Sequence, residues 1–444
     1  MPIPDRYNGR YAYHFSSIEN LDSIIELGLL STNQKLQRGV THVDVAAAGI
    51  QCRRGAMEVP GSEGRHVHDY VPFYFAQKTP MQLSVILKKN VDQQFLIYFA
   101  VPLRIIDSRQ GVFFTSASAN TDIPPPFFCS AESDRLGDLN WGIIDHNKWK
   151  YPDDNERHQK MAELLVPDLV SMADVAYIVA WNDGFAQIIR DRFAEKGVPC
   201  PNVVCNSWHY YPDMQDKRFS FITGPYFLKK GFLDTVSSIE NGRLPNPKFL
   251  NLEQALNAVR ADFCSILELA NIDGLAADYG PHKDDVGTHS RRVAELVFES
   301  PEYNALDLRG KQILEFAAFL HDIGKGPKTR WANSFMDKAD SNHACKSLPM
   351  LQRILTEDVG GLSNNDIRQL VLLVTYDDLL GEIAAKGRDK KQFLDVISCE
   401  EDVNMLVALS RADIGAIDQG WLMGTYQRIE QLRDEAFRLL RGEN

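Results

Sequence analysis

The sequence predicts a protein of two domains, an N-terminal domain of mixed α/β (α+β) class followed by a C-terminal domain built from helices alone. The chain has 444 residues, and domains usually contain about 100 to 200 residues, so more than one domain is expected. Up to about residue 213 the sequence carries short aromatic runs typical of strands. From about residue 252 onward, apolar residues recur instead at the spacing of an amphipathic helix.

The N-terminal domain is predicted to combine strands with short helices. Its clearest strand patterns lie at 70–76, 93–103 and 175–181. A helical pattern follows His14, with leucines and isoleucines on one side, and Gly28 is predicted to end it.

The domain boundary is predicted where Gly, Pro and Asn punctuate the sequence. We therefore assign 1–213 to the first domain, 214–254 to a junction and 255–444 to the helical domain. A proline-rich stretch at 121–128 is typical of an exposed loop.

Composition excludes several classes of protein. Hydrophobic residues make up 44% and charged residues 24% of the chain, which excludes a disordered or fibrous protein. No apolar run reaches about 18 residues and the N-terminus lacks an apolar signal core, so we expect a cytoplasmic protein without a membrane partner. The seven cysteines include no CxxC pair, which argues against a disulfide framework or a cysteine-rich zinc site. A net charge of -12 argues against a sequence-blind nucleic-acid coat but permits a local basic groove.

In the C-terminal half, the most informative residues are two histidines and two aspartates. His289 opens a predicted helix, the pair His321 and Asp322 ends another, and Asp413 lies in a third. Each alone would ordinarily be a cap or a surface residue, but their combination is unusual. Imidazole and carboxylate groups on separate helices can converge in a bundle core to bind a divalent metal.

The pattern H…HDIGK…D resembles the HD-domain phosphohydrolase family, over roughly residues 255–440. The resemblance implies an HD-type helical bundle that binds a divalent metal ion such as Mn, Fe or Mg and hydrolyses phosphoesters. The implied metal ligands are His289, His321, Asp322 and Asp413, with Lys325 as a cation facing the phosphate.

Two further features bear on this resemblance. His343 resembles the extra histidine of dinuclear members, and Asp377-Asp378 stands where some relatives carry His-Asp. A carboxylate can bind a hard metal ion, yet the difference leaves open an alternative in which the helical half is a non-catalytic module that senses a nucleotide.

In the N-terminal half, three motifs occur together. They are the segment from His14 to Leu29, an arginine (Arg54) upstream of HDYVPFYF (68–75), and an RHQ-bearing helix that leads to AELLV (162–166). Together they resemble the DarT family of DNA ADP-ribosyltransferases, over about residues 8–213. Members of this family are toxins of toxin–antitoxin pairs, which implies a macrodomain-type ADP-ribosylglycohydrolase antitoxin as a partner.

The resemblance implies an α/β ADP-ribosyltransferase fold that splits NAD and transfers ADP-ribose to thymine or guanine in single-stranded DNA. His14 and Asn20 would hold the ribose or nicotinamide region of NAD, and Tyr74 would pack against the nicotinamide. Arg54 would assist the incoming base or the pyrophosphate. Glu163 would be the catalytic acid residue.

These residue types suit the implied chemistry. Loss of nicotinamide leaves an oxocarbenium-like ribose that a fixed carboxylate stabilises, and a guanidinium can bind phosphate through its forked donors. We expect the loop 110–150 to face the substrate. RNA or protein as the acceptor remains the alternative to DNA, and the helical half is expected to restrain or reverse the first activity.

Overall fold

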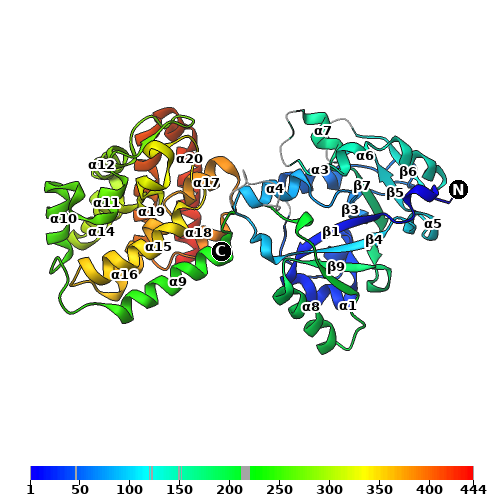
Figure 1. Cartoon of the computed structure of the whole chain (residues 1–444), viewed down its shortest axis with the longest axis horizontal. Helices are drawn as coiled ribbons and strands as arrows, with labels where there is room; N and C mark the ends of the chain where they lie inside the picture. Colours follow the sequence, from blue (N-terminus) through cyan, green and yellow to red (C-terminus); the bar gives the residue numbers. More distant parts are fainter. Residues whose placement is uncertain are drawn as a thin grey trace. The chain divides into compact units, whose positions relative to one another are not determined.

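The computed structural model describes residues 2–45, 48–119, 121, 124–148, 151, 153–211 and 221–443. The chain forms two compact units, Met1–Phe221 and Ile222–Asn444. In Figure 1 the first unit runs from blue to green and the second from green to red. Among these residues, no helix has both the length and the apolar character needed to cross a membrane.

The first unit is built on a mixed sheet of eight strands in the order β10-β9-β4-β1-β3-β7-β5-β6. Only β9 and β10 pair in parallel among the described ladders of this sheet. The predicted strands correspond to β3, β4 and β9. The strands span Tyr11–Ser17 (β1), Tyr70–Tyr74 (β3), Leu96–Pro102 (β4), Phe113–Thr115 (β5), Phe127–Cys129 (β6), Glu163–Pro167 (β7), Tyr177–Ala180 (β9) and Asn202–Cys205 (β10), and β2 (Leu29–Leu30) pairs separately with β8 (Leu169–Val170).

Short helices surround this sheet. The predicted helix after His14 is α1, and Gly28 ends it at a φ of 81° beside β8, where a Cβ atom would meet the Val170 carbonyl oxygen at 2.6 Å. Pro80 occupies the first turn of α4, where its missing N–H costs nothing. The helices are α1 (Leu21–Leu27), α2 (Thr32–Gln37), α3 (Ala48–Ala56), α4 (Pro80–Leu87), α5 (Ile105–Ser108), α6 (Trp141–Ile144), α7 (Asp154–Gln159) and α8 (Asp183–Glu195).

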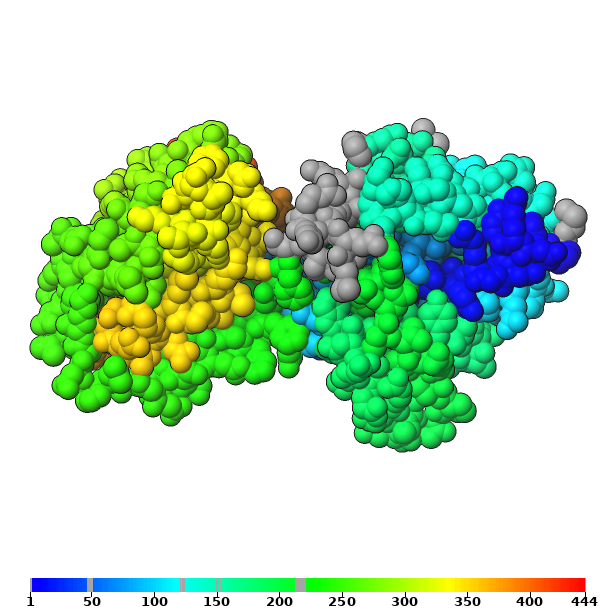
Figure 2. Space-filling view, in the orientation of Figure 1, coloured from blue at the N-terminus to red at the C-terminus, as the bar shows by residue number. Residues whose placement is uncertain are grey.

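Residues far apart in the sequence meet at the surface of this unit. In Figure 2 the N-terminal residues, in blue, lie beside later segments in cyan and green. The ion pair between Arg10 and Asp145, at 2.8 Å, joins two such segments.

The sheet opens between β1 and β3. All seven residues of β1 pair with β4, but the described pairing of β1 with β3 is confined to Tyr13 opposite Tyr74. Beyond that pair a side chain replaces the backbone ladder, because His14 Nδ1 donates a hydrogen bond to the Pro72 carbonyl at 2.8 Å. The strands therefore separate at a fixed point.

The last described residues of the first unit before the junction are fastened to the sheet. Gln82 of α4 and the Tyr98 hydroxyl of β4 both donate to the His209 carbonyl, at 2.7 and 2.8 Å. Gln93 accepts from the Tyr211 N–H at 2.6 Å and donates back to the Tyr211 carbonyl. We call this set of contacts the exit clamp.

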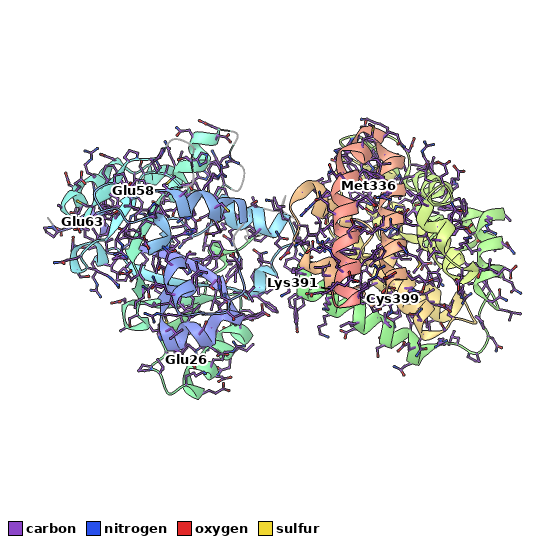
Figure 3. All side chains as sticks on the ribbon, turned by 180° about the vertical axis from the view of Figure 1, so that it is seen from behind. Glu26, Glu58, Glu63, Met336, Lys391 and Cys399 are labelled. Atoms are coloured by element: carbon purple, nitrogen blue, oxygen red, sulfur yellow. The ribbon has the colours of Figure 1, made fainter. Side chains whose placement is uncertain are left out.

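The second unit is helical apart from two strands of two residues each, β11 (Ala276–Ala277) and β12 (Phe335–Met336). Met336, labelled in Figure 3, is fully buried in its core. The helices are α9 (Pro225–Gly242), α10 (Leu252–Ala261), α11 (Leu267–Ile272), α12 (Val286–Val297), α13 (Pro301–Ala305), α14 (Leu308–Leu320), α15 (His343–Arg353), α16 (Asn364–Thr375), α17 (Leu379–Lys386), α18 (Lys391–Leu394), α19 (Glu400–Ile417) and α20 (Gln419–Arg441).

The segment predicted as a junction, 214–254, is largely part of the second unit. Its residues 214–220 lie outside the described part of the chain, but α9 follows directly. Leu228, Phe232 and Ile239 of this helix are buried in the core of the second unit. Gly and Pro on either side of α9 concealed its helical spacing in the sequence, so this stretch begins a domain instead of separating two.

Candidate functional site

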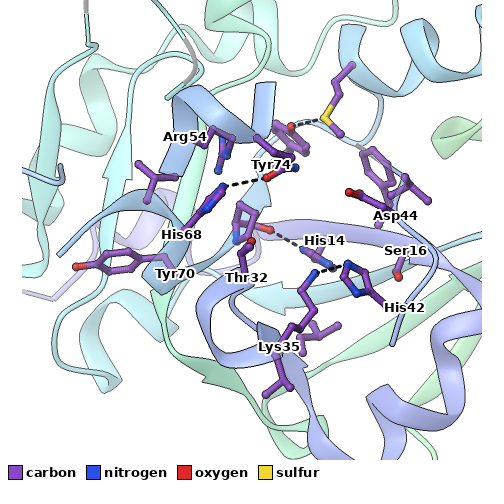
Figure 4. A pocket seen from close by; sticks show the side chains of 18 of the residues that line it. His14, Ser16, Thr32, Lys35, His42, Asp44, Arg54, His68, Tyr70 and Tyr74 are labelled. Carbon is purple, nitrogen blue, oxygen red and sulfur yellow. Dashed lines mark hydrogen bonds between the residues drawn. The ribbon is translucent and has the colours of Figure 1, made fainter. Parts of the chain in front are cut away.

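A pocket with a volume of about 560 Å³ lies where β1 and β3 separate in the first unit. That volume is in the range of sites for small organic ligands. Figure 4 shows side chains from β1, α2, α3 and β3 around it. Four of the five residues predicted to act in the first unit line this pocket, namely His14, Asn20, Arg54 and Tyr74.

His14 presents one ring nitrogen to this environment. Its Nδ1–H is committed to the Pro72 carbonyl, so in the neutral ring Nε2 is the acceptor. Burial lowers the pKa of His14 to about 4 despite that hydrogen bond, and the charge of Lys35 lowers it further. His14 is therefore neutral near pH 7 and suited to accept a hydrogen bond.

Asn20 lines the pocket, but its side-chain amide is hydrogen-bonded to other residues of the protein. Its Nδ2 donates to Ser16 Oγ at 3.0 Å and to the Val43 carbonyl at 2.9 Å, and its Oδ1 accepts from the Val43 N–H at 2.7 Å. These bonds fix the segment 41–45 against β1. Asn20 thus shapes the pocket wall. Both N–H groups of its amide are already used in these bonds, so neither is free for the predicted contact with NAD.

Glu163 and Arg54 form a buried ion pair at the edge of the pocket. The guanidinium donates to both carboxylate oxygens, at 2.9 and 2.8 Å, and Glu163 and Arg54 are only 0% and 7% exposed. Burial alone would lower the pKa of Arg54, but Glu163 outweighs it and raises that pKa. Arg54 lines the cavity while Glu163 lies behind it, where the Ala119 N–H also binds its carboxylate at 3.1 Å.

Tyr74 supplies a flat apolar surface. Its ring lies parallel to that of Phe15, with centroids 6.2 Å apart, and its hydroxyl donates to Met81 Sδ at 2.9 Å. Burial raises the pKa of Tyr74, and the charge of Glu163 raises it further. The phenol therefore stays neutral, as a packing surface for an aromatic ring requires.

Several residues that line the pocket were not predicted from the sequence. Lys35 of α2 donates to His42 Nε2 at 3.2 Å, and burial lowers the pKa of Lys35. Both contribute to the pocket wall, as do His68 and Arg157. HDYVPFYF, which begins at His68, and the RHQ motif, which begins at Arg157, offered a signal, but both were used as landmarks and not as sites.

The loop predicted to face the substrate, 110–150, reaches the pocket with part of its length. Ser118 and Thr121 line the cavity, and the Ala119 N–H holds Glu163 as described above. Residues 120, 122, 123, 149 and 150 lie outside the described part of the chain.

In the second unit, the four predicted metal ligands lie together. His289 Nε2 is 2.9 Å from Asp413 Oδ1, and His321 Nε2 is 3.4 Å from Asp322 Oδ2 and 3.6 Å from Asp413 Oδ1. His321 Nδ1 donates to the Ala318 carbonyl. Its buried Nε2 has no hydrogen-bond partner within the described residues.

A second group of metal-ligating side chains shares Asp322 with the first. His343 Nε2 lies 3.3 Å from Asp377 Oδ2, and these two residues have donor atoms within 4.8 Å of one on Asp322. Asp377 Oδ1 is buried and, in the described part of the chain, without a hydrogen-bond partner. Lys325 Nζ donates to Asp322 Oδ2 at 2.7 Å.

The charges of these clusters favour a cation. Burial opposes protonation of His321, but Asp322 and Asp413 outweigh it and raise the pKa of His321 well above its usual range. Burial likewise opposes ionisation of Asp413, yet the hydrogen bond from His289 and the nearby imidazole of His321 lower its pKa. Buried, ionised carboxylates beside imidazoles with an open nitrogen fit a divalent metal ion.

One histidine near this cluster was not predicted. The ring centroids of His282 and His289 are 6.1 Å apart, and His282 also packs on Tyr279 at 4.6 Å. Burial and the charge of Lys325 lower the pKa of His282 to about 4. No motif or helical pattern in the sequence includes His282, because it lies in a turn before α12.

Comparison with known proteins gives matches to DNA ADP-ribosyltransferases. A family model described as ssDNA thymidine ADP-ribosyltransferase, DarT, matches residues 13–211. A DNA ADP-ribosyl transferase of Thermus aquaticus is 28% identical over 205 residues, which cover 45% of this chain and 88% of that protein. One of Thermus sp. strain 2.9 is 30% identical over 158 residues, 35% of this chain and 73% of that protein.

Two solved structures resemble part of the chain. Thermus sp. 2.9 DarT in complex with ADP-ribosylated ssDNA aligns with a TM-score of 0.42 and 25% identity, over 47% of this chain and 99% of that one. Thermosipho africanus DarTG in complex with ADP-ribose aligns with a TM-score of 0.41 and 20% identity, over 46% of this chain and 52% of that one.

Proposed function

The chain belongs to the DarT family of DNA ADP-ribosyltransferases, and from this premise we propose that its first unit splits NAD and transfers ADP-ribose to a base in single-stranded DNA. The observation that carries the proposal is the buried pair of Arg54 and Glu163 beside a pocket lined by His14 and Tyr74. We take thymine as the first candidate base, because the matching family is described by thymidine, and guanine as the second. We also propose that the protein acts in the cytoplasm.

The proposed reaction uses the charges of the pocket. The bond between nicotinamide and ribose C1′ breaks, its electron pair leaves with nicotinamide, and C1′ becomes cationic. The Glu163 carboxylate stabilises this cation, since a fixed charge in a site without water acts more strongly than in solution. Thymine N3 then bonds to C1′ and loses its proton to Glu163. Arg54 orients the carboxylate, Tyr74 packs against the nicotinamide, and neutral His14 accepts from a ribose hydroxyl.

The full chain with the substitution Glu163→Gln tests this assignment. Because the amide keeps the shape but loses the charge, transfer of labelled ADP-ribose from NAD to a thymine-containing single strand should fall about 100- to 1000-fold. The matched control is Glu195→Gln, at an exposed position near the end of α8, which should label like the unmodified chain. Labelling by Glu163→Gln at the unmodified rate would refute the assignment.

Competition between acceptors decides which polymer is modified. Unlabelled single strands with thymine, with guanine but no thymine, RNA of the same sequence and a denatured protein are each added in excess. The DNA proposal requires that only a DNA strand suppresses labelling. Suppression by RNA or by protein would favour the alternative acceptors instead.

For the second unit we propose a metal-dependent HD phosphohydrolase, with His289, His321, Asp322 and Asp413 as ligands of a divalent ion. The unpartnered buried Nε2 of His321 and the ionised aspartates support this. Such an ion supplies a bound water of lowered pKa and offsets the charge of a phosphoester. Asp322, His343 and Asp377 would hold a second ion, and Lys325 would orient Asp322 and face the phosphate.

Metal content tests this second proposal. The variant His321→Ala/Asp322→Ala of the full chain should lose the bound metal that elemental analysis finds in the unmodified protein. The control Asp395→Asn, at an exposed position after α18, should keep it. Equal metal content in all three proteins would refute the site. Metal binding and nucleotide binding without hydrolysis of bis(p-nitrophenyl) phosphate would favour a nucleotide-sensing module.

We further propose that the helical unit restrains or reverses the first activity, since one chain carries both. The metal-site variant should then be more toxic to cells than the unmodified chain when expressed at the same level, and Glu163→Gln should remove the toxicity of both. Equal toxicity would contradict this relation. If the antitoxin partner is a macrodomain-type ADP-ribosylglycohydrolase, its co-expression should restore growth.

A further inference from the structure

Arg54 can hold Glu163 only while helix α3 is correctly placed. The nearest element to α3 is the short 3-10 turn η3 (Val67–Asp69), which leads directly into β3. The position of α3 therefore depends on how it is joined to this turn.

Two hydrogen bonds join η3 to α3 and to the residue that follows it, one on each side of Arg54 in the sequence. After the helix, the Met57 carbonyl accepts from the Val67 N–H at 2.9 Å. One turn before Arg54, Gln51 Oε1 accepts from His68 Nε2 at 3.0 Å. Gln51 and Arg54 are spaced three apart in α3 and so lie next to each other on the helix surface. This face turns Arg54 toward Glu163.

His68 also packs closely on the helix backbone. A Cβ atom at Gly55 would lie 3.0 Å from His68 Nδ1 and 3.1 Å from its Cε1, so the ring fits against Gly55 only because that residue lacks a side chain. Gly55 follows Arg54 directly, and His68 and Arg54 are both labelled in Figure 4. The imidazole thus contacts α3 on both sides of Arg54.

The turn that carries His68 is itself rigid. The His66 N–H donates to Asp69 Oδ2 at 2.8 Å, and Asn33 Nδ2 donates to Asp69 Oδ1 at 2.6 Å. These two hydrogen bonds to Asp69 fix η3 at the start of β3. Strand β3 pairs along its length with β7, which begins at Glu163. A continuous path therefore runs from the strand that carries Glu163, through His68, to the helix that carries Arg54.

We propose that His68 is a positioning residue for ADP-ribose transfer, which holds Arg54 in its forked contact with Glu163 through Gln51 and Gly55. This inference rests on the proposed function of the first unit. Without His68, the only contacts that remain here among the described residues are the backbone contacts of 57–59, which follow the helix. The part of α3 that carries Arg54 is then free to shift, so Arg54 turns away and the carboxylate loses its orientation.

The test measures kcat and KM for NAD with the full chain and a thymine-containing single strand. His68→Ala should lower kcat about 10- to 100-fold, the usual effect of losing a group that orients a catalytic residue, while KM for NAD changes less than threefold. His68→Gln should recover most of kcat, because its amide nitrogen can replace Nε2 as a donor to Gln51. Glu63→Gln, at an exposed position outside the pocket, is the control and should match the unmodified chain.

Two substitutions on α3 test the same contacts by changing the residues that His68 touches. Gln51→Met removes the acceptor, and the double variant with His68→Ala should be no worse than the worse single variant, because both remove one contact. Gly55→Ala favours the helix itself yet crowds His68, so it should lower kcat without lowering the melting temperature. If His68→Ala fails to fold, these two variants carry the test.

The outcomes separate two failures. An active unmodified chain with kcat within twofold in His68→Ala or Gln51→Met would overturn the positioning role and leave the proposed function standing. So would multiplied losses in the double variant, or no rescue by His68→Gln. An unmodified chain that transfers no ADP-ribose would remove both proposals.

Discussion

His14 reaches the pocket with only one ring nitrogen available, and its protonation state decides what that nitrogen can do. Since the pKa of His14 is lowered to about 4, Nε2 should remain an unprotonated acceptor throughout pH 5 to 8. NMR of the full chain with 13C-labelled histidines, assigned by His14→Asn, measures this. A midpoint near 6.5 for His14 would contradict the burial that the structure shows.

His209 is a second buried histidine, and it affects stability instead of catalysis. Both of its ring nitrogens are buried without a hydrogen-bond partner among the described residues, and burial lowers its pKa to about 3. Because the pKa of His209 is lower in the folded state than in the unfolded state, the unfolded chain binds a proton at a higher pH than the folded chain does. The free energy of unfolding therefore falls as the pH drops from about 6.5 toward 3.

Replacing His209 with phenylalanine should remove this dependence. The ring already packs on Tyr13 and Tyr98 with centroids 4.9 Å away in each case, so an apolar ring fits the same surroundings. At pH 5 the free energy of unfolding of the first unit should gain about 2 kcal/mol relative to the unmodified chain. Urea titrations at pH 7 and pH 5 measure the difference, and the same pH dependence in both proteins would disprove it.

At the scale of elements, one side chain holds a segment of the pocket wall. Because Asn20 binds both the N–H and the carbonyl of Val43 and is itself bonded to Ser16 of β1, Asn20→Ala should loosen that wall. We expect KM for NAD to rise about tenfold, which corresponds to about 1.4 kcal/mol of binding free energy, with a smaller change in kcat. Steady-state kinetics measure both values. An unchanged KM would show that the segment does not contribute to NAD binding.

Sequence alone predicted the elements whose pattern is local. The strands β3, β4 and β9 carry continuous apolar and aromatic runs, so they could be predicted from the sequence. The predicted α/β class of the first unit was confirmed. Helix α9 was missed because Gly and Pro flank a pattern that only its packing reveals. Strands β5 and β6 have three residues each, too few to show a period.

The candidate site was predictable to the extent that motifs carried it. Arg54 and Glu163 were chosen by resemblance, and the structure brings them into direct contact. Lys35, His42 and His68 were missed because they come from separate segments that meet only when the sheet opens between β1 and β3. The hydrogen bonds between the Asn20 amide and Val43 could not be predicted either, because no local sequence pattern connects these two residues.

At the scale of the whole molecule, the two units have separate hydrophobic cores that share no residue among those described. Each core should therefore unfold as its own cooperative transition in calorimetry. NAD at about 100 times its Kd should stabilise one transition of the Glu163→Gln chain by about 2.7 kcal/mol, while removal of metal by a chelator should lower only the other. A single transition that responds to both additions would contradict this independence.

The exit clamp has a consequence for how a protein of two such units can arise. Every contact of the clamp is made by residues up to Tyr211, so a gene that stopped there would still encode a first unit in which the backbone of His209 and Tyr211 is bonded to α4 and to the region of β4, an inner strand of the sheet. A fusion after this point leaves the clamp intact, so we expect that another domain can replace the helical half without redesign of the first unit.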